Sequence, residues 1–431
     1  MPELRPFRGI RYTPRAGEPG DVVAPPYDVI GPEQHLELCQ GSPFSIAHLI
    51  LGTRTSAEAA MPDDWYGHAA KLLQSWLADS VVATDDTPTF YVYTQAFGYE
   101  GRRHRRRLLL GALKLEPYEA GQVLPHEHTM PGPKADRLRL MQACRANLSP
   151  ILAFSPDHSG RLNALLDDID SWPPAVSFAH TDGVLHELRC VVDPASQDEL
   201  ARAIEPDPLY IADGHHRYET ALAYQQLQRQ SAVTPSSPSP ADFTLAACMS
   251  GADPGMVIRP THRLIHWQGE PDPRSALEAA REAFDVQLLP DAGLAEAAAA
   301  ASYDANAVAF VIYAGRPAGY AAVSIRSAAA MAASPYPPSS ALRSLPAAVL
   351  RHGFITHALG TADAEIAYTA DPREAIARVD ACDARLAALL PAVRPQELMA
   401  IVDAGERMPP KSTYFWPKPL TGMVMRSLSS F

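Results

Sequence analysis

The chain has 431 residues, of which 47% are hydrophobic and 20% are charged, a balance typical of a folded protein with room for two domains. Its 37 lysines and arginines against 49 aspartates and glutamates give a formal net charge of -12, which disfavours DNA or RNA as the main partner. No apolar run approaches the ~20 residues that span a bilayer, so a membrane partner is not expected either.

The cysteines and the N-terminus indicate the compartment. The five cysteines are scattered and include no CxxC pair, which is typical of reduced thiols and of neither a zinc site nor a disulfide framework. The first residues lack the apolar stretch of a secretion signal. We therefore expect a cytoplasmic protein, and the sequence assigns no set of metal ligands.

Turn residues and hydrophobic periodicity outline the first half of the chain. The stretch APPYDVI is expected to be a stiff loop, because two adjacent prolines forbid a regular helix. The basic run RRHRRR is expected to be a solvated hairpin tip. The expected elements are a β-type piece at 9–12, the stiff loop at 24–30, a helix at 64–79, and a hairpin of strands 89–97 and 106–115 joined by 98–101.

Strands and helices alternate irregularly in the rest of the chain, which favours an α/β or α+β fold of mixed sheets with flanking helices. The Ser- and Pro-rich tract 231–240 is a flexible connector by composition. It is the candidate boundary between a phosphate-binding domain at 1–230 and a second α+β lobe at 241–431, and a surface insertion is the alternative. The expected elements are a loop at 125–129, strands at 151–154, 187–192, 208–212, 243–250 and 307–313, and helices at 134–145, 214–228, 274–284 and 371–390.

The segment DGHHR lies where a strand turns into a helix. Asp213 is expected to cap the helix, and Gly214 lets a ligand approach the backbone closely. His215, His216 and Arg217 fall in the first helical turn, where free amides and the positive helix end favour an anion. Adjacent helical residues diverge by about 100°, so the two histidines are poorly placed to share a metal. A plain cap with surface polar residues is the alternative.

The segment PHEHT with the helix after it forms a second polar cluster. Glu127 or His126 is a candidate acid or base, Thr129 offers a hydroxyl, and Lys134 and Arg137 are cations. This mixture suits binding a polyphosphate and moving a proton. The histidine spacing differs from HExxH, and a polar loop before a solvated helix start is the alternative.

Two further segments carry candidate residues. The C-terminal MPPKSTYFWPK lacks the glycines of a P-loop, but its Lys411 and Lys418 are expected to fold back towards the site; the alternative is a buried C-terminal strand. In the stiff APPYD loop, Asp28 is a candidate for a carboxylate of the site. The alternative is that this loop has only a structural role. No GxSxG and no dinucleotide-binding glycine motif is present.

These four segments, taken in order, resemble the DUF1015 family of uncharacterised prokaryotic proteins, over essentially the whole chain. The strand–DGHHR–helix element also resembles the phosphate-binding box of the ParB/sulfiredoxin superfamily, which includes free-serine kinases. That resemblance implies a ParB/sulfiredoxin-like core in which 214–217 hold nucleotide phosphates and Asp213 lies near the metal or the reacting group. Sulfiredoxin chemistry needs a nearby cysteine and ParB needs basic helices, so the kinase branch fits best.

The expected function is therefore a nucleotide-dependent phosphotransferase acting on a small hydroxy compound such as L-serine, with ATP or ADP and Mg²⁺ as cofactors. The candidate bases are Glu127, Asp28 and Asp213, in that order, while Lys134, Arg137 and Lys411 assist the phosphate site. Two alternatives stay open: a phosphohydrolase acting on a phosphorylated metabolite such as phosphoserine, and a non-catalytic nucleotide-sensing protein.

Overall fold

The computed structural model describes residues 1–56, 64–129, 131–231, 238–291, 293, 309–325, 340–356, 359–360 and 364–429. The chain divides into two units. The first comprises Met1–Pro125, Thr129–Met256 and Pro417–Phe431, and the second comprises His126–His128 and Val257–Trp416. Residues 232–237 of the expected connector lie outside the described residues.

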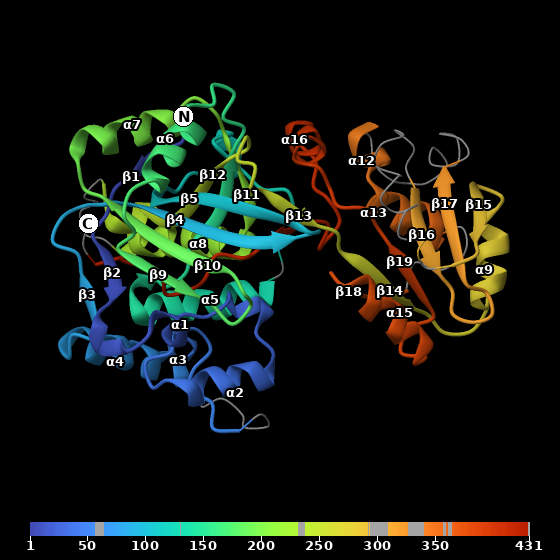
Figure 1. Ribbon diagram of the computed structural model, residues 1–431, viewed down its shortest axis with the longest axis horizontal. Helices are drawn as coiled ribbons and strands as arrows, with labels where there is room; N and C mark the ends of the chain where they lie inside the picture. Colours follow the sequence, from blue (N-terminus) through green and yellow to red (C-terminus); the bar gives the residue numbers. More distant parts are fainter. Residues whose placement is uncertain are drawn as a thin grey trace. The chain divides into compact units, whose positions relative to one another are not determined.

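In the described part of the first unit, nine strands form one mixed sheet with the order β6-β11-β8-β12-β5-β4-β10-β9, and β1 pairs with β5. The long hairpin of β4 and β5 runs through the sheet (Figure 1). β12 joins this hairpin to β8. The strands are β1 (Leu4–Arg5), β4 (Phe90–Tyr99), β5 (Arg102–Lys114), β6 (Val123–Leu124), β8 (Ile151–Ser155), β9 (Val176–Ala179), β10 (Leu185–Val191), β11 (Leu209–Asp213) and β12 (Phe243–Ser250).

Three helices bury their apolar faces on this sheet. These are α6 (Arg161–Asp170), α7 (Pro194–Ile204) and α8 (His215–Ser231), and their buried side chains share one core cluster with β5, β8 and β11. Tyr218 of α8 is fully buried there, and its hydroxyl donates to the Glu116 carbonyl oxygen at 2.7 Å. The start of α8 is therefore fixed against the carboxyl end of β11.

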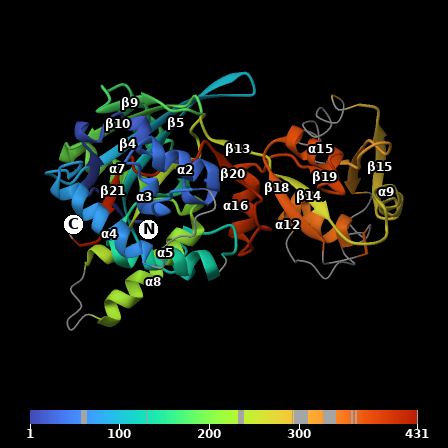
Figure 2. The same ribbon diagram turned by 90° about the horizontal axis from the view of Figure 1, so that it is seen from below.

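The two ends of the chain meet in a small second sheet of the first unit. Its order is β3-β2-β21-β7, with bounds Val82–Thr84, Gly9–Tyr12, Met425–Ser427 and Ala146–Asn147. Around it lie η2 (Tyr27–Val29), α1 (Pro19–Val22), α2 (Pro32–Gly41), α3 (Ala47–Ile50), α4 (Trp65–Ala78) and α5 (Pro131–Cys144), and α5 packs against both α4 and α8 (Figure 2). Residues from 417 onward thus return to the first unit.

The basic run after the hairpin turn is only partly a solvated tip. Arg102 and Arg103 are exposed, but Arg106 is fully buried and donates to the Gln95 side chain and to the Pro417 carbonyl oxygen. Arg107 is buried as well and pairs with the Asp253 carboxylate. The prediction was wrong for this part because the acceptors come from segments far away in the sequence.

The second unit contains a six-stranded sheet with the order β15-β17-β16-β19-β14-β18. Its described strands are β14 (His262–His266), β15 (Phe284–Leu289), β16 (Ala309–Tyr313), β17 (Tyr320–Ile325), β18 (Glu365–Thr369) and β19 (Leu386–Leu389), and β13 (Val257–Arg259) pairs with β20 (Tyr414–Trp416) outside it. The helices are α9 (Pro273–Ala280), α12 (Ser340–Ser344), α13 (Pro346–Ala348), the π-helix η5 (Val349–Ile355), α15 (Pro372–Asp380) and α16 (Pro395–Asp403).

One predicted helix of this unit is wrong in its second half. Residues 371–390 were expected to be helical, but the helix ends at Asp380 and the run LAAL forms β19. All four side chains of β19 are buried, and a short apolar run buried on both faces has no period that separates strand from helix. The helix expected at 274–284 likewise ends early, and β15 begins at Phe284. The first two residues of the strand expected at 307–313 lie outside the described residues.

The expected architecture of mixed sheets with flanking helices is confirmed. Among the residues that the structure describes, no helix combines the length and the apolar character needed to cross a membrane.

Candidate functional site

The turn between β11 and α8 forms the centre of the candidate site. Gly214 has φ +94°, and a Cβ there would lie 2.9 Å from the Arg217 side-chain Nε. Both the left-handed backbone and this close approach require glycine. The Gly214 carbonyl accepts the Tyr218 amide at 3.0 Å, so Gly214 and not Asp213 stands at the helix cap, which corrects the expectation for Asp213.

The Asp213 carboxylate is instead shared by two cations. One oxygen accepts from the Arg217 guanidinium, and the other pairs with Lys418 Nζ at 2.7 Å. Lys418 Nζ also contacts Asp28 at 2.7 Å. Burial alone would raise the pKa of Asp213, but Lys418 and Arg217 outweigh burial and hold it below the usual value. The cluster therefore places an ionised Asp213 between two positive charges.

Arg217 has further acceptors in the loop before β8. Its guanidinium donates to Ser149 Oγ at 3.1 Å and to the Pro150 carbonyl oxygen. With Asp213, these acceptors account for three of its five N–H groups. The hydrogen bonds of the described residues thus leave two of its donors unassigned.

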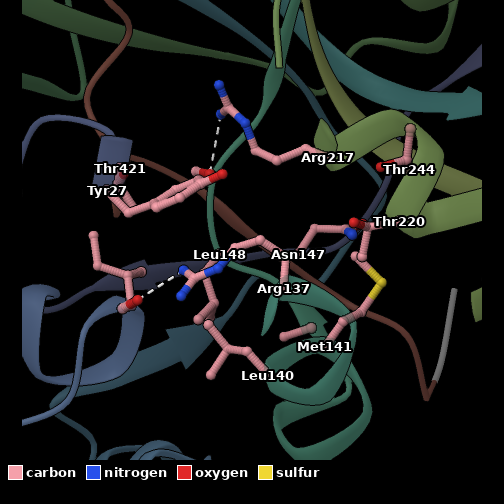
Figure 3. Close-up of a pocket in the computed structure, with 13 residues that line it drawn as sticks. Tyr27, Arg137, Leu140, Met141, Asn147, Leu148, Arg217, Thr220, Thr244 and Thr421 are labelled. Atoms are coloured by element: carbon pink, nitrogen blue, oxygen red, sulfur yellow. Dashed lines mark hydrogen bonds between the residues drawn. The ribbon is translucent and has the colours of Figure 1, made fainter. Parts of the chain in front are cut away.

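A pocket lies beside Arg217 and also contains Arg137 (Figure 3). The Arg137 guanidinium stacks on the Tyr27 ring at 4.2 Å and donates to the Ile50 carbonyl oxygen at 2.7 Å. In Figure 3 the Tyr27 ring lies between the two guanidinium groups. The hydroxyl of Thr421 is buried at this pocket without a hydrogen-bond partner among the described residues.

The size and lining of this pocket limit its occupant. Its volume is about 50 Å³, which admits a few waters or one small group but is far below the ~300 Å³ of ordinary ligand pockets. Its remaining lining residues are mostly apolar or hydroxyl-bearing: Leu140, Met141, Ala146, Asn147, Leu148, Ser149, Thr220 and Thr244. The pocket fits a single small anionic group and not a whole nucleotide.

The second polar cluster is divided between the two units. In the first unit, Thr129 Oγ1 donates to Glu219 at 2.6 Å and Lys134 Nζ pairs with the same carboxylate oxygen at 2.8 Å. Because Glu219 lies on α8, these two residues are tied to the helix that begins with DGHHR. Arg137 pairs with its neighbour Asp136 at 2.5 Å. Each of these cations therefore has a carboxylate partner.

The other members of this cluster are described in the second unit. His126 Nε2 lies 2.8 Å from Thr413 Oγ1, and the Glu127 carboxylate accepts the Ser412 amide at 3.2 Å. Lys411 is exposed, and its carbonyl accepts from Arg263 at 3.3 Å. This unit therefore groups the PHE and KST motifs with each other.

The two histidines of DGHHR differ in burial. His215 is buried and its charge contributes a smaller effect to the low pKa of Asp213. His216 is half-buried, and its carbonyl accepts the Thr220 hydroxyl at 2.6 Å.

A large part of the predicted site residues lies in the first unit, and Lys418 joins them although it was not among those predicted. The residues are Asp28, Thr129, Lys134, Arg137, 213–217 and Lys418. Lys418 was noted in the sequence only as part of the C-terminal segment, whereas Lys411 was chosen as the site residue. The available signal was the second lysine of MPPKSTYFWPK. Sequence spacing alone did not show which lysine belongs with DGHHR.

A profile of the family described as "Protein of unknown function (DUF1015)" matches residues 4–348. The chain belongs to this family. The family resemblance predicted from the four motifs is thereby confirmed. A search of curated proteins found no match for this DUF1015 protein.

Three solved structures are similar to parts of this chain. A free serine kinase in complex with AMP is 13% identical, with a TM-score of 0.34, covering 71% of this chain and 86% of that one. A conserved hypothetical protein from Pyrococcus furiosus is 15% identical, with a TM-score of 0.32, covering 72% and 93%. SbnI with a C-terminal truncation, from Staphylococcus aureus, is 9% identical, with a TM-score of 0.35, covering 72% and 85%.

Proposed function

We propose that this DUF1015 protein is a nucleotide-dependent phosphotransferase that transfers a phosphoryl group from ATP or ADP to a small hydroxy compound, with L-serine as the first substrate to test. The observation that carries the proposal is the cluster in which Asp28 and Asp213 converge on Lys418 while Arg217 holds Asp213 from the other side. Phosphoryl transfer needs cations that position phosphates and carboxylates that hold a metal ion or a proton.

The phosphate site is assigned to the pocket between Arg137 and Arg217. Each guanidinium uses three of its five N–H groups on protein acceptors, so a phosphate can bind to the remaining ones without displacing Asp213. The buried Thr421 hydroxyl supplies one further donor. The volume of about 50 Å³ supports one phosphate group inside, with the rest of the donor outside.

The carboxylates receive different roles in this proposal. A carboxylate whose pKa is held low, as that of Asp213 is, is a weak general base. Mg²⁺ prefers carboxylate ligands, but Lys418 already pairs with both Asp213 and Asp28, so an ion bound there would have to displace the lysine. When bound, the ion would neutralise charge on the donor phosphates.

The proton of the acceptor hydroxyl needs a separate base. Asp28, which lies in the first unit with the phosphate site and pairs with Lys418, is our candidate. In the step, the acceptor oxygen forms a bond to phosphorus, the bond from phosphorus to the bridging oxygen of the donor breaks, and the hydroxyl proton passes to the carboxylate. The cations Arg137 and Arg217, which line the pocket, stabilise the charge on the phosphate oxygens.

The test is incubation of the full-length protein with ATP or ADP and Mg²⁺, with and without L-serine, followed by detection of phosphoserine. Phosphoserine formed only when donor and serine are both present supports transfer. Phosphate released from phosphoserine without a nucleotide would instead indicate the phosphohydrolase. Nucleotide binding without turnover on a panel of hydroxy compounds would indicate the sensing protein.

The variant Arg217→Ala tests the phosphate site within this assay. Removing a charge-assisted contact of about 1.5–3 kcal/mol is expected to weaken binding of the phosphate ligand about 10- to 150-fold. Arg229→Ala is the matched control, because Arg229 lies on the same helix, pairs with Asp242 at 2.6 Å and has a side chain that is 61% exposed. Equal affinity in folded Arg217→Ala and Arg229→Ala would remove the phosphate site from the proposal.

A further inference from the structure

The hairpin of β9 and β10 places two histidines and one aspartate at its closed end. The His180 amide donates to the Val184 carbonyl at 2.9 Å, and the Gly183 amide donates back to the His180 carbonyl at 2.9 Å. Gly183 has φ +78°, as a three-residue hairpin loop with a left-handed last residue requires. Asp182 lies in this loop and accepts the Val184 amide at 3.0 Å.

The register brings the two histidines to one face of the sheet. His186 is paired with Phe178 across the hairpin, and His180 follows Phe178 by two positions. Because side chains alternate between faces with a period of two, His180 and His186 are diagonal neighbours on the same face. The centroids of the two rings are 5.9 Å apart, and the rings are arranged edge to face.

The ligand atoms of the three side chains are close enough for one metal ion. One atom each of His180, Asp182 and His186 lies within 4.8 Å of the others. The distance from His180 Nδ1 to Asp182 Oδ1 is 3.4 Å, which equals the edge of a tetrahedron with metal–ligand bonds of about 2.1 Å. This pair therefore already has the spacing of two ligands on one ion.

The two histidines are buried and incompletely satisfied. The side chain of His180 is 8% exposed and His186 is 1% exposed. Nε2 of His186 has no hydrogen-bond partner among the described residues, although an unsatisfied buried polar atom costs about 1–3 kcal/mol. Nδ1 of His180 has only the Asp182 carboxylate, at 3.4 Å. This pair of nitrogens beside one carboxylate points to a ligand that accepts their lone pairs.

A neighbouring tyrosine fixes the orientation of one ring. His186 Nδ1 lies 2.6 Å from the Tyr93 hydroxyl, and Tyr93 is on β4 next to β10. If Nδ1 carries the proton, Nε2 presents its lone pair to the cluster, which is the usual arrangement of a metal-bound histidine with an outer hydrogen-bond partner.

We propose that His180, Asp182 and His186 form a binding site for a divalent transition metal ion such as Zn²⁺, separate from the phosphotransferase residues proposed above. Two imidazoles and one carboxylate are a common ligand set for such ions, with water in the remaining position. Asp182 is 45% exposed, so the ion is reached from solvent through the loop.

The site has a structural route to the C-terminal segment. The Leu420 amide donates to the Tyr93 hydroxyl at 3.4 Å, and Lys418 lies two residues earlier. A metal ion on His186 stiffens the ring against which Tyr93 is held. Metal loading is thus expected to slow hydrogen exchange of the Lys418 and Leu420 amides as well as of the hairpin.

The test is Zn²⁺ titration of the full-length, chelator-treated protein by calorimetry, together with the visible absorption of added Co²⁺. We expect one equivalent of Zn²⁺ and the Co²⁺ bands of a four- or five-coordinate site. Asp182→Asn keeps the acceptor for the Val184 amide, so the loop is retained while the anionic ligand is lost. This variant and His180→Gln are expected to weaken Zn²⁺ binding more than about 100-fold, beyond the ~10- to 100-fold of an outer partner such as Tyr93→Phe.

His158→Gln is the matched control, because His158 Nδ1 also pairs with an aspartate, Asp207, at 2.8 Å but is outside the three-residue cluster. Its Zn²⁺ affinity is expected to equal that of the unaltered protein. The proposal is overturned if the unaltered protein takes up no Zn²⁺, or if folded Asp182→Asn and His180→Gln bind it as the control does. Neither readout depends on phosphotransferase activity, so the two proposals fail separately.

Discussion

Replacing Lys418 by methionine removes the charge at the centre of the Asp28–Lys418–Asp213 cluster and keeps most of the side-chain volume. In the structure Lys418 makes two contacts of 2.7 Å, one to each carboxylate, and its side chain is 10% exposed. After the substitution Asp213 keeps Arg217 as a partner, while Asp28 loses the only ion pair that the described residues give it. The variant therefore leaves the largely buried Asp213 with one cation instead of two, and leaves Asp28, whose side chain is 30% exposed, without its ion pair.

The magnitude follows from the number and burial of these contacts. Two charge-assisted bonds of about 1.5–3 kcal/mol each are offset in part by the cost of burying the ammonium group. Removing one partner of a buried ion pair typically costs about 3–5 kcal/mol. We expect Lys418→Met to lower the free energy of unfolding of the first unit by about that amount.

Urea-dependent hydrogen exchange, followed on peptides of β11 and α8, measures the first unit by itself. Asp213→Asn and the double variant complete a cycle, in which a coupling energy of about 2 kcal/mol is expected because the two residues are in direct contact. Arg229→Ala is expected to cost less than Lys418→Met, because the Arg229 side chain is 61% exposed and Asp242 keeps Gln225 as a donor. The reasoning would be refuted if the stability losses of Lys418→Met and Asp213→Asn simply added in the double variant. It would also be refuted if Lys418→Met were as stable as Arg229→Ala.

The remaining predictions concern the same unit and the thiols. Gly214→Ala forces a side chain into a left-handed backbone and against Arg217, so a cost of about 1–3 kcal/mol and weaker phosphate binding are expected in exchange and calorimetry. The pKa of Asp213 is lower in the folded protein than in the unfolded chain. Its contribution to stability is therefore complete above its unfolded pKa of about 3.9 and is lost as the pH falls below that value. Urea midpoints measured across acid pH are expected to fall less in Asp213→Asn than in the unaltered protein. Burial raises the pKa of Cys248 to about 12, so peptide mapping after alkylation of the native protein in mildly alkaline solution should find Cys382, which is exposed, modified and Cys248 protected. Alkylated Cys248 in folded protein would contradict this.

Local patterns in the sequence predicted local structure well. The helix expected at 64–79 is α4, the strand expected at 243–250 is β12, and the strand–turn–helix around DGHHR is β11 and α8. These segments combine clear periodicity with glycine or proline at their ends, so neighbouring residues decide the outcome. The four motifs likewise predicted the family correctly.

The errors arose where distant segments decide the structure. The run LAAL became a central strand because β14 and β16 flank it, and no local signal separates that from a helix end. Arg106 is buried because Gln95 and the Pro417 carbonyl satisfy it. Burial of a guanidinium cannot be recognised from a charge run when one acceptor lies on the neighbouring strand and another is 311 residues away.

The residues of the site follow the same division. Gly214 and Arg217 were recognisable because one short motif contains the strand end, the turn and the helix start. The role of Lys418 depends instead on β21 pairing with β2, which brings the C-terminus back beside the stiff loop that carries Asp28. Lys418 is 205 positions from Asp213 in the sequence, and the two residues can pair only once β21 has joined β2. An ion cluster of this kind is stable only when every member is present, so the fold of the two chain ends and the chemistry of DGHHR depend on each other.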